Sequence, residues 1–166
     1  MEKKRLVFTL KAWPAVFGVT VALSYLTELF AKHAFGVEFP EQAQVQVMRD
    51  LFKSGNVALI SVNLVLVLLA MPAIEEVLFR YLTRFGMWLW APMAAAFSLA
   101  HYIDYGRLAA NGEFAFTGWN SAFLALFLFG FCQSWIYRKT GRLWCAMLNH
   151  ALFNTTNLVL LFIIPA

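Results

Sequence analysis

Two adjacent carboxylates and an arginine interrupt one of the most apolar stretches of this chain. Glu75 and Glu76 follow the Val-, Leu- and Ala-rich residues 57–70, and Arg80 comes one helical turn after Glu76. An ionised carboxylate in hydrocarbon costs roughly 3 kcal/mol or more, so such groups usually face a protein interior or a water-filled cavity. The spacing of four lets Glu76 and Arg80 pair along one helix face, whereas Glu75 projects about 100° away without an obvious local partner. The sequence predicts a structural ion pair beside a carboxylate that is kept for chemistry.

Three further polar residues lie inside apolar segments, at depths that match that of Glu75. A single histidine in a membrane helix often only donates a hydrogen bond to a neighbouring helix, and a single asparagine often only packs. Several polar residues at a similar depth on three different segments are more informative than any one of them alone, because intramembrane ionisable residues usually mark a functional site. At 1.5 Å per residue from the nearest basic turn, the depths are about 16 Å for Glu75, 22 Å for His101, 14 Å for His150 and 20 Å for Asn154.

These residue types together support hydrolysis. A carboxylate in a low-dielectric site can act as general base toward water, and a histidine facing it can hold the same water. A second histidine, with an asparagine one turn away on the same face, can donate hydrogen bonds to a developing oxyanion. A glutamate and two histidines can equally hold a zinc ion with a bound water, so both mechanisms stay open. Cys132 and Cys145 have no evident base and no metal-type spacing, and we interpret them as core residues.

The composition places these side chains in a membrane protein. The chain has 166 residues, of which 61% are hydrophobic and 13% charged, and its mean hydropathy is +0.67. Its net charge of +4 does not indicate nucleic-acid binding, because the charges gather in turns between apolar runs, where they set orientation in a bilayer. We predict an all-α fold, a polytopic transmembrane helical bundle of about five transmembrane helices with a four-helix catalytic core.

Five apolar segments are expected to position the site. Pro72 lies inside the second segment, which would be about 45 Å long as a helix, and is expected to kink it just before the carboxylates. A short amphipathic helix over residues 41–53 is expected to lie on the membrane surface, and residues 104–113 read as a polar loop. We divide the chain into an N-terminal part, residues 1–55, and a core, residues 56–166. The expected transmembrane helices cover residues 6–30, 56–85, 87–102, 114–137 and 143–166.

The distribution of basic residues predicts the orientation. With five spans, eight Lys and Arg residues fall on the side of the N-terminus and four on the other side, which favours a cytoplasmic N-terminus. The first apolar segment is long and has no clear small-x-small cleavage site, so we expect a transmembrane helix there rather than a signal peptide. The expected location is the plasma membrane of a bacterium or an archaeon, as an integral protein.

Three motifs in order resemble the signature of the CAAX-protease and bacteriocin-processing (CPBP, or Abi) family. Its members are intramembrane endopeptidases related to the type II CAAX prenyl endopeptidase. The order, the spacing and the placement on three separate apolar helices agree over residues 56–166. Outside the catalytic positions, the resemblance implies structural roles for Glu76, Arg80 and Phe97. The motifs are Glu75-Glu76-x-x-x-Arg80, Phe97-x-x-x-His101 and His150-x-x-x-Asn154.

The same resemblance implies catalytic roles. Glu75 and His101 would activate the water, and His150 and Asn154 would form the oxyanion hole. Members of the family have been described both as metalloproteases and as metal-independent glutamate proteases. We favour the glutamate mechanism, with no cofactor, because no third strong ligand beyond Glu75 and the two histidines is apparent. Glu76 could supply one, so a zinc ion held by Glu75, His101 and His150 stays open.

The expected partners are the lipid bilayer and a substrate that is a membrane protein or a lipidated or anchored peptide. Many relatives have extra N-terminal helices, whereas a single helix precedes the core here, so a short C-terminal anchor segment is an alternative to a prenylated CAAX end. Two other classes were weighed. One is a non-enzymatic membrane protein, such as an immunity factor or a partner-binding bundle, and the intact motifs argue against it. The other is a small transporter or proton relay, and the lack of inverted repeats argues against that.

Overall fold

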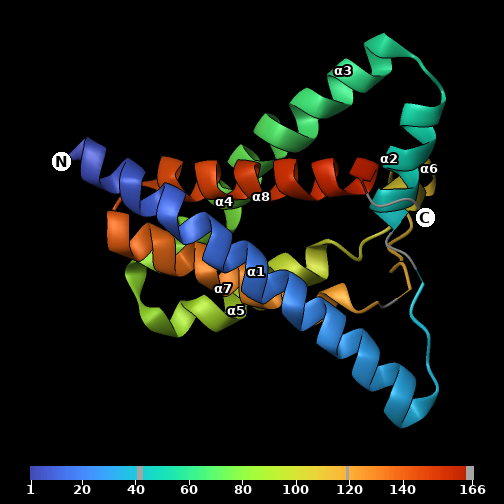
Figure 1. The fold of residues 1–166 in the computed structure, drawn as a ribbon, viewed down its shortest axis with the longest axis horizontal. Coiled ribbons are helices and arrows are strands. Elements are labelled where there is room, and N and C mark those ends of the chain that lie inside the picture. Colours follow the sequence, from blue (N-terminus) through green and yellow to red (C-terminus); the bar gives the residue numbers. More distant parts are fainter. Residues whose placement is uncertain (41–42, 119, 164–166) are drawn as a thin grey trace.

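The computed structural model describes residues 1–40, 43–118 and 120–163, and within them the fold is all-α (Figure 1). The longest element is α1 (Glu2–Phe35), which starts earlier and ends later than the expected segment 6–30. It ends at Gly36, whose φ of 65° is left-handed, and the Gly36 N–H bonds the carbonyl of Lys32 in the last turn. A glycine takes this conformation without the steric cost that a Cβ would bring, which explains where α1 stops.

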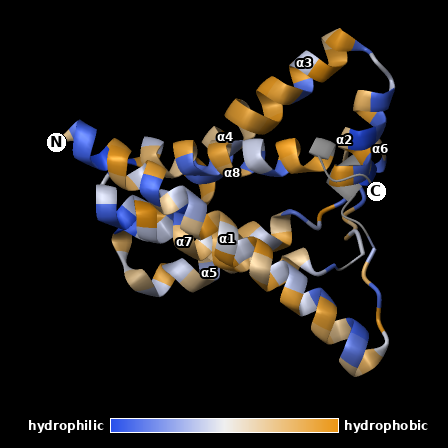
Figure 2. Cartoon of the chain, viewed as in Figure 1, coloured by the Kyte–Doolittle hydropathy of each residue, from blue (hydrophilic) through white to orange (hydrophobic). Residues whose placement is uncertain are grey.

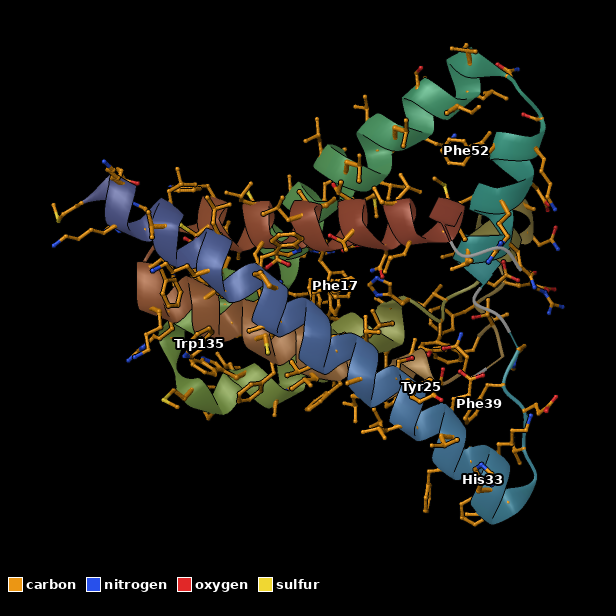
Figure 3. All side chains as sticks on the ribbon, in the orientation of Figure 1. Phe17, Tyr25, His33, Phe39, Phe52 and Trp135 are labelled. Carbon is orange, nitrogen blue, oxygen red and sulfur yellow. The ribbon has the colours of Figure 1, made fainter. Side chains whose placement is uncertain are left out.

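The bundle is centred on α7 (Ala122–Thr140), which packs against α5 (Trp90–Ala100), α1 and α8 (Leu143–Ile163). Aromatic pairs join these helices. Phe8 of α1 meets Trp135 of α7 with ring centroids 5.2 Å apart, and Phe17 of α1 meets Phe153 of α8 at 5.4 Å. Figure 3 labels Phe17 where α1 crosses the bundle and Trp135 below the first half of α1. Rings that meet edge-on or tilted add stability beyond the area they bury.

The second expected segment forms one helical rod, Val57–Phe85, whose character changes along its length. It begins as α3 (Val57–Val65), passes through a π-helical turn η1 (Leu66–Ala70), continues as α4 (Met71–Arg80) and ends in a 3₁₀ turn η2 (Leu82–Phe85). The π turn comes directly before Pro72, which is where a kink is expected. Figure 1 shows α3 diverging from the bundle while α4 stays inside it.

The α3 helix consists mostly of hydrophobic residues, as its colour in Figure 2 shows. Val57, Val62 and Val65 are all exposed, and α3 has no buried residue. Within the described residues, two helices are long and apolar enough to cross a membrane, α1 and the rod Val57–Phe85, while the apolar helix Met87–Ala100 is shorter. These helices indicate a membrane location; five spans, their orientation and the division at residue 55 stay predictions.

The amphipathic helix is present as α2 (Ala43–Lys53), and residues 41–42 of the expected range lie outside the described residues. Figure 3 shows Phe52 of α2 in the angle between α2 and α3. The expected polar loop instead holds a short helix, α6 (Tyr105–Asn111). The Asp104 carboxylate accepts a hydrogen bond from the Arg107 N–H at 2.9 Å, which is how a short acidic side chain starts a helix.

The fourth expected helix starts later than the apolar pattern indicates, at Ala122 rather than at residue 114. Two backbone hydrogen bonds explain the difference, because they pair residues 115–117 with the chain that follows α5. The Asp104 N–H donates to the Ala115 carbonyl at 2.9 Å, and the Thr117 N–H donates to the Tyr102 carbonyl at 2.7 Å. A backbone that is paired across the chain in this way cannot also form the first helical turn.

Candidate active site

The α4 helix carries a fully buried ion pair. Glu76 and Arg80 are each 0% exposed, and Arg80 Nε lies 3.3 Å from Glu76 Oε2. The contact is an ion pair without hydrogen-bond alignment, since neither atom has a hydrogen-bond partner in the described part of the chain. The predicted i,i+4 pair is therefore confirmed, and its burial means that neither charge is replaceable without stranding the other.

The Arg80 guanidinium is enclosed by two other helices. Its Cζ lies 4.7 Å above the ring of Phe97 on α5, a distance typical of a cation–π contact. On α7, a Cβ built at Gly130 would lie 3.1 Å from Arg80 Nη2 and 3.1 Å from the Cα of Ala94. Glycine at this position therefore leaves the space that the guanidinium fills, and Phe97 supplies the facing π surface. These contacts explain why Arg80 and Phe97 accompany the carboxylates in sequence.

His150 of α8 lies between the two carboxylates. Its Nδ1 is 2.9 Å from Glu76 Oε1, and its Nε2 is 3.5 Å from Glu75 Oε2. An imidazole N–H donates to a carboxylate, so the Nδ1–H of His150 is held by Glu76 and its Nε2 is directed toward Glu75. The Glu75 side chain is 16% exposed and so keeps access to its surroundings, whereas that of Glu76 has none. Since α4 and α8 pack side by side, this bridge depends on their rotation and not on sequence spacing (Figure 1).

His101 stands at the end of α5 with its ring against Phe97, the two centroids 4.6 Å apart. Its Nδ1 lies 2.9 Å from the Phe97 carbonyl oxygen. A carbonyl only accepts, so Nδ1 carries the proton, and in the neutral ring Nε2 carries the lone pair. Glu75 and His150 both lie within electrostatic range of this ring. The His150 ring also meets Phe97, with centroids 5.9 Å apart, so both predicted histidines pack on one ring, and Glu75 joins them through its contact with His150.

Asn154 lies one helical turn further along α8 and makes a different contact. Its Nδ2 donates to the backbone carbonyl of Val67 at 2.9 Å. Val67 lies in the π turn, where the Met71 N–H bonds the Leu66 carbonyl, five residues back. Continued by one residue, that register would give the Val67 carbonyl the N–H of residue 72, which is proline and has none. Asn154 therefore satisfies an acceptor that Pro72 leaves open, with one of its two amide hydrogens.

A second buried polar chain was not predicted from the sequence. Gln133 of α7 donates to Asn149 Oδ1 of α8 at 2.9 Å, and Asn149 Nδ2 is 3.5 Å from the Thr9 carbonyl of α1. Gln133 and Asn149 are fully buried, so their hydrogen bonds tie the three helices in one register. The signal was available, because a glutamine in the apolar middle of a helix needs a partner.

The donor atoms do not form a metal-binding group as they stand. Among the residues that the structure describes, no three or more His, Cys, Asp or Glu side chains are grouped so that they could hold a metal ion. His150 Nδ1 is held by Glu76 and His101 Nδ1 by a carbonyl, so only the Nε2 atom of each ring is left as a possible ligand. The predicted zinc set of Glu75, His101 and His150 is not gathered around one point in this arrangement, and it stays a prediction.

Comparison with protein families matches residues 57–156 to the family described as Type II CAAX prenyl endopeptidase Rce1-like. The matched region begins at the first residue of α3 and ends inside α8, so it contains all the predicted catalytic residues, Glu75, His101, His150 and Asn154. It covers more than half of the 166 residues. The comparisons with curated proteins and with solved structures give no match.

Proposed function

Because the chain belongs to the type II CAAX prenyl endopeptidase Rce1-like family, we propose that it is an intramembrane endopeptidase of the glutamate type. Family membership implies protease activity of the CAAX type and a peptide or protein substrate. The finer proposal is that the chain cleaves a peptide bond beside a lipid or helical membrane anchor. The observation that supports a glutamate-type catalytic site is the contact of Glu75, the more accessible carboxylate, with His150. This contact lies next to the fully buried Glu76–Arg80 pair.

In the proposed reaction a water molecule binds between the Glu75 carboxylate and His101 Nε2. Glu75 takes one proton from this water, and the water oxygen attacks the carbonyl carbon of the scissile peptide. Glu75 then gives the proton to the leaving amine nitrogen as the C–N bond breaks. Support for the role of His101 comes from its Nδ1 contact with the Phe97 carbonyl, which directs the lone pair of the neutral ring to Nε2. His101 accepts one water hydrogen there and orients the attack.

The oxyanion of the tetrahedral intermediate is proposed to accept hydrogen bonds from His150 and Asn154. Since Nδ1 of His150 already donates to Glu76, His150 can donate from Nε2 only as an imidazolium. The buried Glu76 carboxylate stabilises that cation, which gives Glu76 a positioning role behind the oxyanion hole. Asn154 has a second amide hydrogen beyond the one bound to Val67, and this one is proposed to reach the oxyanion.

The test is cleavage of two anchored probes by the purified protein in lipid nanodiscs. One probe is a farnesylated peptide with a CAAX-type end, and the other is an unprenylated peptide with a transmembrane anchor. Glu75→Gln and His101→Ala are each expected to lower the rate by about 10²–10⁴-fold, the usual contribution of a general base. Glu28→Gln, an exposed carboxylate near the far end of α1, is the matched control and keeps the wild-type rate. Near-wild-type cleavage by Glu75→Gln contradicts the proposal.

A further inference from the structure

A small pocket lies away from the carboxylates, where η2 meets the C-terminal end of α7. Its volume is about 130 Å³, well above the roughly 10–15 Å³ that a single water needs. Thr83 at its base is buried, whereas the two arginines at its rim are exposed, so the pocket opens to the surface on its basic side. The residues that line it are Thr83, Arg84, Tyr137, Arg138 and Gly141.

Among the residues that the structure describes, the two arginines of this pocket have no acidic partner, unlike other arginines at the surface. Arg142, in the same turn as Gly141, lies 3.5 Å from Glu2, and Arg107 lies 3.0 Å from Glu113. In the described ranges, neither Arg84 nor Arg138 has a carboxylate within ion-pair distance. Two unpaired guanidinium groups at one pocket form a local excess of positive charge, which favours an anion.

The Arg84 side chain is held in place by aromatic rings. Its Cζ lies 3.8 Å from the Tyr81 ring centroid and 4.6 Å from that of Phe85. A guanidinium commonly stacks on an aromatic ring through its flat face, an arrangement that leaves its N–H edge for an acceptor. A fixed guanidinium loses less conformational freedom on binding than a mobile one, so the site is partly preorganised.

Exposed aromatic residues place this pocket at the level of the lipid headgroups. Tyr81, Phe85 and Trp88 are 42%, 63% and 74% exposed, and they lie along the chain beside Arg84. Exposed tyrosine and tryptophan residues are characteristic of the boundary between membrane and water. Arg142 reaches Glu2, so the turn between α7 and α8 lies at the same end of the molecule as the hydrophilic N-terminus in Figure 2.

We propose that this pocket binds the phosphate group of an anionic phospholipid. Arg84 and Arg138 would donate to the phosphate oxygens, as guanidinium groups commonly do, while the exposed rings of Phe85 and Trp88 would contact the acyl chains. Inorganic phosphate has the same acceptor oxygens but no acyl chains, so it would lack the second set of contacts. A hydrogen bond links the pocket to the candidate active site, because Thr83 Oγ1 donates to the Arg80 carbonyl at 2.7 Å.

The test follows the thermal unfolding of the full chain in detergent as each ligand is titrated. The probes are dioleoylphosphatidylglycerol, dioleoylphosphatidylcholine and inorganic phosphate. Phosphatidylglycerol is expected to raise the melting temperature, because a ligand that binds only the folded state stabilises it. Phosphatidylcholine is expected to have little effect because its choline cation, next to the phosphate, is repelled by the two arginines, and inorganic phosphate because it lacks the acyl chains. Arg84→Gln and Arg138→Gln should each weaken the apparent affinity for phosphatidylglycerol about tenfold or more, since each removes a charge-assisted hydrogen bond.

The matched control is Lys139→Gln. It removes one positive charge from the last turn of α7, which also holds Arg138, at a residue that does not line the pocket. It is expected to keep the wild-type response to phosphatidylglycerol. The proposal is overturned if all three variants lose the response equally, because the binding would then depend on diffuse charge. It is also overturned if Arg84→Gln and Arg138→Gln respond like wild type, or if phosphatidylcholine or inorganic phosphate stabilises the protein as strongly as phosphatidylglycerol does. Each variant is compared with its own ligand-free melting temperature, and no substrate is needed.

Discussion

The hydrogen bond from Asn154 to Val67 allows the structural and catalytic roles of Asn154 to be separated. Asn154 Nδ2 lies 2.9 Å from a carbonyl that the chain cannot satisfy locally, since position 72 is proline. Leaving a carbonyl without a partner costs about 1–3 kcal/mol, and hydrogen bonds between membrane helices average about 0.6 kcal/mol. Asn154→Ala is therefore expected to destabilise the protein by about 1 kcal/mol through this bond.

Pro72→Ala restores a backbone N–H that can reach the Val67 carbonyl in the π register. In the Pro72→Ala background, Asn154→Ala should leave the free energy of unfolding nearly unchanged. The double-mutant cycle should therefore give a coupling energy of about 1 kcal/mol between the two positions. The measurement is equilibrium unfolding in mixed micelles of dodecyl sulfate and dodecyl maltoside. An equal loss of stability in both backgrounds would refute the interpretation that Asn154 compensates for the proline.

Cleavage rates of the same four proteins test the catalytic role. Removal of one oxyanion donor lowers kcat by about 10²–10³-fold. If the second amide hydrogen of Asn154 stabilises the oxyanion, this loss appears in both backgrounds, because Pro72→Ala repairs the helix and not the oxyanion hole. Recovery of cleavage in the double variant would show that Asn154 acts only on the position of α4.

Two further predictions concern the buried ion pair and use the same unfolding assay. Gly130→Ala should destabilise the protein by about 1–3 kcal/mol, because its Cβ would lie 3.1 Å from both Arg80 Nη2 and the Ala94 Cα. The control is Gly18→Ala, whose Cβ would meet no atom within 4 Å and which should not destabilise the protein. Arg80→Met should cost about 3–5 kcal/mol, because it leaves the buried Glu76 carboxylate with the His150 N–H but without the guanidinium charge that neutralises it. Adding Glu76→Gln should recover part of that loss, and no recovery would count against the pair.

The parts of the site that follow from local spacing were predictable from sequence. The Glu76–Arg80 pair depends only on the rise and rotation of one helix, and the structure confirms it at 3.3 Å. The depth count also predicted that Glu75 and His150 meet, since helices that cross the same slab bring residues of equal depth to one level. The catalytic roles of these residues stay predictions.

Other features depend on how the helices are rotated and where their periodicity changes. Nothing in the sequence indicates that His150 directs Nδ1 to Glu76 and Nε2 to Glu75, because this follows from the packing of α8 against α4. The contact of Asn154 requires the π turn, and a shift of one residue in hydrogen-bond register leaves no mark on the hydrophobic pattern. The late start of α7 has the same kind of cause, since it depends on backbone bonds to the end of α5.

The central claim is that Glu75 and His101 activate water directly, and metal content combined with activity tests it most directly. Purified protein would be dialysed exhaustively against a chelator, analysed for zinc and other transition metals, and assayed on the anchored peptide probes. The glutamate mechanism predicts wild-type cleavage with far less than one metal ion per chain. Three results together would contradict the claim. The purified protein would hold one zinc ion per chain, its activity would be lost when zinc is removed and restored when zinc is added back, and His101→Ala and His150→Ala would no longer bind the zinc.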